Sequence, residues 1–437
     1  MLSIAKLDRM RMAAGICLVI DGNPLIFFVK ETLGLAPGST IMTAAILAFG
    51  LVLMIPTTAL HKLYKPNRNA TLFGLSFIAL SLFYYFFFFA GYERDTTDLI
   101  YVAYMLIFLF LLINIPNDII RDIVPVIILF TLVSNLALVY ALQRDPLWTI
   151  GQRAFISYET GGPERGGNPH PFAKNALMGV IASLVWAARD KTPTYVKGLC
   201  LVNAVFSLGI QILTVARSSY VALALITVLF FFFNVRPAQV KQAFRVLKSP
   251  LSLFIMACIA GVAIFFLRRN MMVYDIVIHY AVTNAEKNLE NVYALLGMKM
   301  NNQVVAFDAS SNTRSVNFNY FTQLFFYGDI TKVLVGQGYK FMFVDIPIIE
   351  ALVNHGIPGL VLFGGMQCIL LYHAVNAIRL NQHPFATFLG YFYIYVFVLM
   401  FTNGRPYDYF IWFPYLLMVR FLGVEKLLPE RLLNPNV

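Results

Sequence analysis

Residues 70–90 read ATLFGLSFIALSLFYYFFFFA, a run of twenty-one residues without a charged side chain. A helix needs about twenty mainly apolar residues to cross the hydrocarbon core of a bilayer, where only hydrogen bonds within the helix satisfy its backbone. Similar runs recur along all 437 residues, of which 59% are hydrophobic and 13% charged. Soluble domains have about 25% charged residues. The sequence therefore predicts an all-α polytopic membrane protein with about twelve transmembrane helices.

The first apolar run follows Lys6, Arg9 and Arg11, contains Asp21 and Pro24, and lacks the small-residue cleavage site of a signal peptide. We interpret it as a retained first span. The predicted spans lie near 12–29, 40–59, 70–90, 97–114, 122–142, 171–188, 198–215, 218–234, 250–267, 358–377, 384–402 and 408–423.

Lysine and arginine are unevenly distributed between the two sides of these predicted spans. An even number of spans puts both termini on one side, and the segments of that side are rich in lysine and arginine. The short turns of the other side hold only Lys30, Arg94, Arg217 and Arg405. The positive-inside rule makes both termini cytoplasmic. This bias accounts for much of the net charge of +11, so we expect no nucleic-acid partner.

The chain then divides into three predicted parts. Residues 1–267 hold the earlier spans and an outer loop at about 143–170, and residues 358–437 hold the last spans and a cytoplasmic tail. Between them, residues 268–357 are predicted to form one large outer loop with short surface helices. An insert of this size in one place favours an enzyme acting at the membrane surface over a channel or transporter.

Residues 345–355, DIPIIEALVNH, are too polar to cross a bilayer. We predict a surface helix with Asp345 as its N-cap, Pro347 in its first turn and Gly356 after its last turn.

The sequence contains no motif for a metal or nucleotide cofactor. It has no CxxC, P-loop, GxGxxG or HExxH pattern. All four cysteines lie inside apolar runs, where small buried side chains are the plain interpretation. We therefore expect neither a metal site nor a cofactor. The four are Cys17, Cys200, Cys258 and Cys368.

Arginines on the outer face are candidates for binding phosphate, because a guanidinium group forms bidentate bonds to it and stays charged. Arg217 lies at a tight junction between two predicted spans, in VARSSY (215–220), although it could instead extend to lipid headgroups. Arg314 lies in SSNTR (310–314), where the alternative is a solvated loop charge. The outer arginines are Arg144, Arg153, Arg165, Arg217, Arg268, Arg269, Arg314 and Arg405.

Asp345 and His355 are candidates for acid–base chemistry. Asp345 would need a raised pKa to act as a general base, and helix capping is its other interpretation. His355 titrates nearer neutrality, although it could simply bond free carbonyls at the end of the helix. Glu350 follows Asp345 by five residues, so the two carboxylates do not share a helix face.

Two more polar residues lie at predicted span ends. We expect His170, between Pro169 and Pro171, to end the loop before the span at 171–188. Asp21 is a functional candidate as an intramembrane carboxylate, but a helix break beside Gly22 would leave it in water.

Several stretches together resemble the bacterial O-antigen ligase and polymerase superfamily, the Wzy-like proteins. Arg217-Ser218-Ser219 is similar to that family's "SRG" at an outer junction. Asn312-Thr313-Arg314 followed by Gly336-Gln337-Gly338 is similar to its loop arginine and "GxG". Asp345 leading to Gly356-Ile357-Pro358-Gly359 is similar to its "GIIG" element. Residues 166–170, GGNPH, resemble its "Gly…Pro-Asn" entry, with His170 in place of Asn, and the similarity covers about 143–410.

The resemblance implies a GT-C-like architecture in the bacterial inner membrane, with the active face periplasmic. It implies an inverting, metal-independent glycosyltransferase acting on glycans linked to undecaprenyl diphosphate. Arg217 and Arg314 would hold the diphosphate leaving group, with Arg165, His170 and Arg405 as further substrate-binding residues. A chain-length regulator and a flippase are the implied partners besides the bilayer.

Asp345 occupies the position where ligases carry a histidine. This favours a polymerase of O-antigen or exopolysaccharide over a ligase that transfers the glycan to lipid A-core. A flippase or other transporter is the alternative from a different class, although no internal repeat is evident.

Overall fold

The computed structural model describes residues 4–57, 60, 62–91, 94–149, 152–158, 166–189, 192–234, 319–328, 330–424 and 427, with short pieces between 248 and 304. The predicted span at 250–267 lies almost wholly outside the described residues, as do Arg165 and Arg314. The chain divides into two compact units. The larger comprises Met1–Leu147, Arg153–Val228 and Phe321–Val437, and the smaller comprises Trp148–Gln152 and Leu229–Tyr320.

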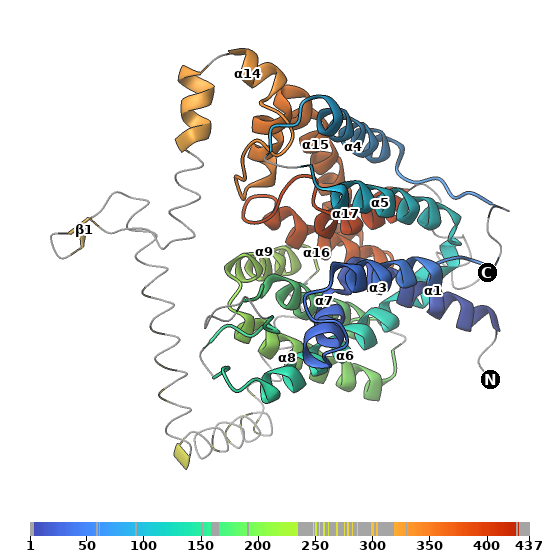
Figure 1. The fold of residues 1–437 in the computed structure, drawn as a ribbon. Coiled ribbons are helices and arrows are strands. Elements are labelled where there is room, and N and C mark those ends of the chain that lie inside the picture. The colour runs from blue at the N-terminus through green and yellow to red at the C-terminus, as the bar shows by residue number, and fades with distance from the viewer. Residues whose placement is uncertain are drawn as a thin grey trace. The chain divides into compact units, whose positions relative to one another are not determined.

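Within the larger unit, one group of helices packs around α6 and α7 (Figure 1). It consists of α1 (Ile4–Asp21), α2 (Asn23–Phe27), the π-helix Phe28–Thr32, α3 (Thr40–Leu53), α6 (Ile123–Arg144), α7 (His170–Ala187) and α8 (Thr194–Thr214). α9 (Arg217–Phe233) begins in the same unit.

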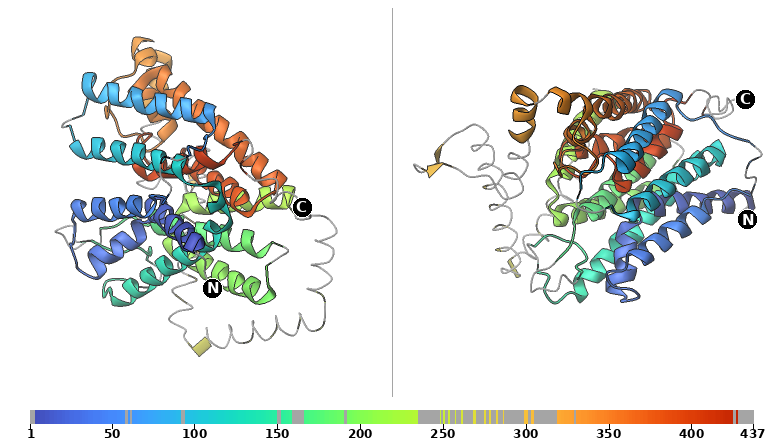
Figure 2. Two further views of the ribbon diagram at one scale, coloured as in Figure 1. Left: turned by 90° about the vertical axis from the view of Figure 1, so that its right-hand side faces the viewer. Right: turned by 45° about the horizontal axis from the view of Figure 1, so that its top comes forward.

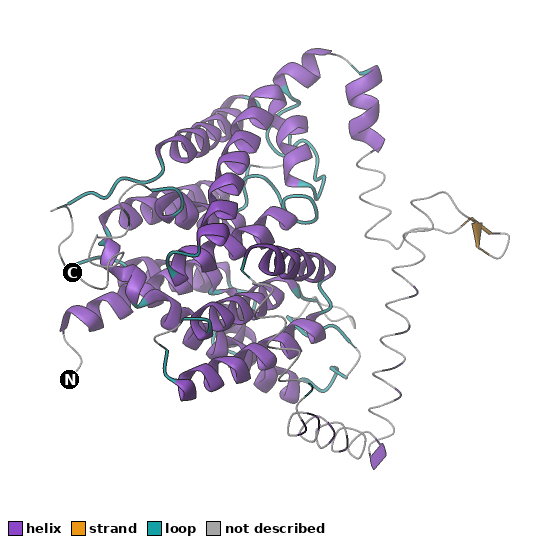
Figure 3. Cartoon of the chain, turned by 180° about the vertical axis from the view of Figure 1, so that it is seen from behind, coloured by secondary structure: helices purple, strands orange, loops and turns teal. Residues whose placement is uncertain are grey.

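A second group packs around α15, which lies along α4 and α16, while α17 lies along α5 (Figure 2). It consists of α4 (Arg68–Phe87), α5 (Thr96–Asn114), α14 (Ile330–Val335), α15 (Pro347–Leu380), α16 (Pro384–Leu399) and α17 (Tyr409–Phe421). A 3-10 helix, Asn117–Arg121, precedes α6. In the part of the chain that is described, the only strands are β1 (Lys299–Met300) and β2 (Gln303–Val304), which pair as a small hairpin (Figure 3).

Local sequence signals start three of these helices. The side chains of Ser39, Asn67 and Asp95 accept backbone N–H bonds at the N-termini of α3, α4 and α5. Each such cap stabilises a helix by about 1 kcal/mol.

Five helices are long and apolar enough to cross a membrane, namely α4, α5, α6, α8 and α15. The pair Ile4–Asp21 and Asn23–Thr32 passes the same criteria together, but it is bent by 78° at the break. The other predicted spans between residues 40 and 423, apart from 250–267, also coincide with helices. The described fold is thus that of a helical membrane protein.

Contacts define two ends of the larger unit. At the first, which we call the basic end, Arg9 pairs with Asp122 at 2.6 Å, and Arg11 donates to the carbonyl of Leu53. Arg420 donates there to the carbonyl of Leu112, joining the ends of α17 and α5. We call the opposite end the site end. Lys174 joins the C-terminus of α1 to the N-termini of α7 and α17 there, and Tyr339 joins the C-terminus of α4 to the N-terminus of α5.

The helix predicted at 345–355 is confirmed as the first segment of α15, but it is not a surface helix, because its residues from Glu350 to His355 are buried, and its predicted cap is wrong. Pro347 lies in the first turn, and Gly356, with φ 67° and ψ −162°, interrupts the helix as expected. Ile346 is the N-cap residue, and it makes no side-chain capping bond. Asp345 has a left-handed φ of 60°, and its carboxylate accepts an N–H from Gly404 at 3.2 Å instead.

Candidate functional site

The break at Gly356 is built against the Gly336-Gln337-Gly338 segment. A helix end leaves backbone carbonyls without intrahelical partners. Here Gln337 and Gly338 donate their N–H groups to the carbonyls of Val353 and Asn354, at 2.9 and 3.0 Å. A Cβ atom on Gly336 would lie 2.5 Å from the Gly356 nitrogen. The glycines therefore allow two backbones to touch, which gives the motif a scaffolding role.

Just before this break, a buried carboxylate joins two segments far apart in sequence. Glu350 is fully buried, and its Oε1 accepts hydrogen bonds from the Tyr407 hydroxyl at 3.0 Å and from Asn354 Nδ2 at 3.3 Å. Arg405 Nε lies 3.7 Å from the same oxygen, and Arg405 Nη1 donates to the Tyr407 hydroxyl at 2.8 Å. We call Glu350, Asn354, Arg405 and Tyr407 the Glu350 cluster.

The turn that carries Arg405 is held from both sides. Asp345 accepts the N–H of Gly404 at 3.2 Å, and Asp408 accepts the N–H of Arg405 at 2.9 Å. The Arg405 guanidinium stacks on the ring of Phe343, 4.8 Å from its centre. Asp345 therefore contributes to the placement of Arg405 as well as standing at the start of α15.

Burial shifts the ionisation of the groups in this turn. It raises the pKa of Asp408, against the opposing effect of the Arg405 N–H and charge. Burial also raises the pKa of Tyr407 far above its usual value, reinforced by Glu350. For Arg405, burial alone would lower the pKa, but Tyr407, Glu350 and Asp408 raise it above its ordinary value. Arg405 thus stays a cation and Tyr407 a neutral phenol.

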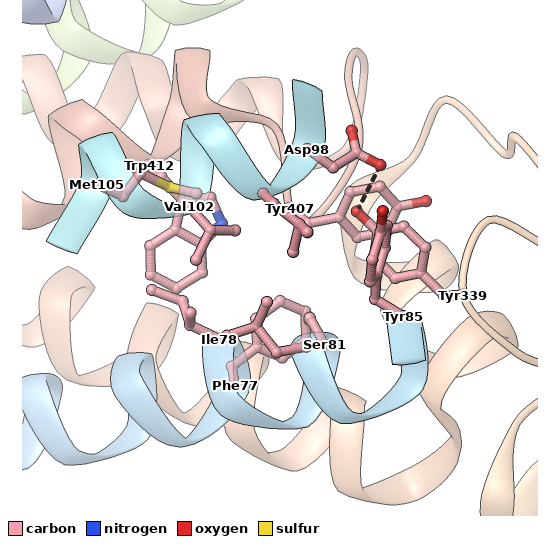
Figure 4. Close-up of a pocket in the computed structure, with 12 residues that line it drawn as sticks. Phe77, Ile78, Ser81, Tyr85, Asp98, Val102, Met105, Tyr339, Tyr407 and Trp412 are labelled. Atoms are coloured by element: carbon pink, nitrogen blue, oxygen red, sulfur yellow. Dashed lines mark hydrogen bonds between the residues drawn. The ribbon is translucent and has the colours of Figure 1, made fainter. Parts of the chain in front are cut away.

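A second group of polar side chains lies beside a small cavity of about 20 Å³ (Figure 4). Tyr339 donates to Asp98 at 3.2 Å, and Lys340 pairs with the same carboxylate at 2.7 Å. The rings of Tyr339 and Tyr407 lie 4.6 Å apart. Burial and the nearby Asp98 raise the pKa of Tyr339. The cavity has room for about one water molecule, so it does not hold a substrate.

His355 is enclosed by aromatic rings. One interpretation of the sequence expected it to bond the free carbonyls at the end of the helix, and it does not do so. Its ring lies 5.1 Å from that of Tyr84 and 5.5 Å from that of Phe77. Neither ring nitrogen has a hydrogen-bond partner among the described residues. It is fully buried, so its side chain is not open to solvent.

Arg217 and His170 each stand at a helix N-terminus. Val215, in a left-handed conformation with φ 51°, ends α8, and the half-buried Arg217 opens α9 two residues later. The predicted tight junction is therefore confirmed. His170 opens α7, and its N–H is accepted by Asn168 at 2.9 Å.

Asp21 is not in water, contrary to the expectation for a helix break at this point. The break at Gly22 exists, but Asp21 is 1% exposed and lies 3.6 Å from the Lys174 ammonium. Lys174 also donates to the carbonyl of Ile20 at 2.6 Å and lies 3.9 Å from the centre of the Phe410 ring. The pair therefore joins the end of α1 to the first turns of α7 and α17.

Glu350, Tyr407 and Lys174 were not among the residues predicted for the site. Lys174 and Asp21 had a signal, because each is a charge inside a predicted span and such charges usually pair. Glu350 had no comparable signal, since Tyr407 and Arg405, its partners in the cluster from another segment, lie more than fifty residues further along the chain. In the described part of the chain, no three His, Cys, Asp or Glu side chains are placed to hold a metal ion.

Comparison with known proteins does not identify a family for this chain. No family model matches the sequence, and no curated protein matches it significantly. The class defined by the structure is therefore a helical membrane protein with a group of charged and aromatic side chains at one end.

Proposed function

We propose that this protein is a Wzy-type polysaccharide polymerase, an inverting glycosyltransferase that joins lipid-linked repeat units at the outer face of the bacterial inner membrane. The observation that carries the proposal is the placement of Arg217. It is fixed at the start of α9, where its own charge adds to the positive end of the helix dipole. The adjacent Ser218 hydroxyl is buried without a hydrogen-bond partner among the described residues. This combination suits the diphosphate of a lipid carrier.

In the proposed reaction, a hydroxyl of the incoming repeat unit attacks the anomeric carbon of the growing chain. The new glycosidic bond forms as the bond from that carbon to the diphosphate oxygen breaks, with inversion at the carbon. Asp345 accepts the hydroxyl proton, and undecaprenyl diphosphate leaves. Arg217 and Arg314 stabilise the charge that develops on the leaving group. His170, which opens α7, and Arg165, which lies outside the described residues, complete the proposed donor site.

The proposal is tested by Arg217→Ala and Arg314→Ala in a strain that lacks the chromosomal gene. We expect each variant to lower long-chain surface polysaccharide by about a hundredfold or more, as loss of a group that binds the transition state does. Arg144→Ala is the matched control, because it removes the same charge from the C-terminal end of α6, where Arg144 stacks on Tyr140.

Protein levels in the membrane fraction must be equal for the comparison to count. Wild-type amounts of long polymer from both variants would refute the proposal. Free lipid-linked polymer in the deletion strain would indicate a ligase, whereas single-repeat lipopolysaccharide fits a polymerase. Substrate accumulating on the cytoplasmic side would indicate a flippase.

A further inference from the structure

We propose that Arg405, with Phe343 and Asp345, binds a neutral sugar ring of the glycan and not the diphosphate, and that Glu350 and Tyr407 are positioning residues for Arg405. This inference rests on the proposed function in one respect, because it takes the ligand to be a glycan. It assigns the two ends of a lipid-linked substrate to different arginines.

The charges around Arg405 argue against a diphosphate ligand. Three carboxylates contact its side chain or its turn, those of Glu350, Asp345 and Asp408. Lys340, the other cation that acts on Asp408, is already paired with Asp98. Bringing a dianion to a group of carboxylates is unfavourable, because like charges repel strongly at partly buried sites.

The same groups suit sugar hydroxyls. A hydroxyl both donates and accepts hydrogen bonds, so it matches a guanidinium donor beside a carboxylate acceptor. Phe343 is 48% exposed and adds an apolar ring under the guanidinium. The Arg405 side chain is 21% exposed. Its described contacts use Nε and Nη1, which leaves Nη2 for an external acceptor.

Glu350 acts through Arg405 and does not touch the ligand. Its side chain is fully buried, and both oxygens are occupied, since Oε2 accepts the Val344 N–H at 3.0 Å. Tyr407 bridges the carboxylate and the guanidinium. Two contacts on different atoms, Nε and Nη1, hold the guanidinium plane in one orientation, which is what recognition of a hydroxyl pair requires.

The test uses the full-length protein in lipid nanodiscs and two probes. One probe is the repeat-unit oligosaccharide released from the strain's own lipid carrier by mild acid, which carries no diphosphate. The other is inorganic pyrophosphate. Binding of the oligosaccharide is followed by saturation-transfer NMR and that of pyrophosphate by calorimetry.

We expect Arg405→Ala and Phe343→Ala to weaken oligosaccharide binding about tenfold and to leave pyrophosphate binding unchanged. Arg217→Ala should do the reverse, and Arg144→Ala should change neither. Weaker pyrophosphate binding in Arg405→Ala with intact oligosaccharide binding would overturn the inference, as would wild-type protein that binds no oligosaccharide. Oligosaccharide binding that depends on Arg405 supports it even if the chain proves not to polymerise in cells.

The positioning role has its own measurement. Glu350→Gln should weaken oligosaccharide binding in the wild-type background and have no further effect in Arg405→Ala. Glu350→Asp, which keeps the charge, should recover part of the binding. Equal losses in both backgrounds would show that Glu350 does not act through Arg405, whatever the thermal stability of the variants.

Discussion

His355 is a polar, titratable residue in a fully buried, aromatic environment. The imidazole is fully buried among aromatic rings, and no described residue bonds either nitrogen. An unsatisfied buried polar group costs about 1–3 kcal/mol. We expect His355→Leu to keep or raise the thermal unfolding midpoint in detergent, and to retain long-chain polymer in cells. Loss of polymer from a variant that is folded and inserted would show instead that the imidazole takes part in catalysis.

Asp345 and Glu350 show how far residue types alone could predict the site. The motif around Asp345 correctly indicated a helix start at Pro347 and a break at Gly356, because proline and glycine act locally, but the predicted capping bond is absent. It did not indicate that the carboxylate bonds Gly404, since that contact depends on a turn almost sixty residues away. From the sequence, Glu350 was expected to be an ordinary polar residue on a surface helix. Its burial against Arg405 depends on the fold.

At the scale of elements, the contact between Gly336 and Gly356 joins α14 to the break in α15. A Cβ atom on Gly336 would lie 2.5 Å from the Gly356 nitrogen and 2.6 Å from the Asn354 carbonyl oxygen. The φ angle of Gly336 is +87°, which favours glycine. We expect Gly336→Ala to lower the free energy of unfolding by about 2 kcal/mol or more. The loss would appear as a lower midpoint in a detergent thermal-shift assay.

Gly198→Ala is the matched control, because a Cβ atom at this position in α8 meets nothing within 4 Å. A helix generally favours alanine over glycine by about 0.5–1 kcal/mol, so this variant should be neutral or slightly more stable. If Gly336→Ala behaved like its control, the backbone contact would not hold these elements together.

For the first span, hydropathy predicted the position along the chain but not the bend between α1 and α2. The predicted run at 12–29 matched apolar composition, and Gly22 and Pro24 indicated a break near its end. The fold adds a reason for the break to persist. Lys174 bonds the Ile20 carbonyl at the break and pairs with Asp21. A buried charge left without its partner is strongly destabilising, so α1 and α7 depend on each other.

For the whole molecule, local patterns predicted the positions of most helices to within a few residues, because apolar run length and caps act over short distances. Pairings across the bundle depended on contacts that no local pattern encodes. Arg9 joins the first turns of α1 to Asp122 at the start of α6, and Arg420 joins the end of α17 to the end of α5, so these four helix ends meet at the basic end.

The two ends of the larger unit lead to a prediction about the side of the membrane on which each lies. Lys332 is an exposed residue of α14 at the site end, and Lys65 is exposed just before α4 at the basic end. From the positive-inside rule we expect the basic end to lie in the cytoplasm. In a variant with its four native cysteines replaced by alanine, we expect Lys332→Cys to react with a membrane-impermeant maleimide when only the outer membrane is permeabilised. Lys65→Cys should react only after the inner membrane is opened. The unsubstituted cysteine-free protein is the control for background labelling. The opposite pattern of reactivity would place the Glu350 cluster on the cytoplasmic side and would contradict a role in a periplasmic reaction.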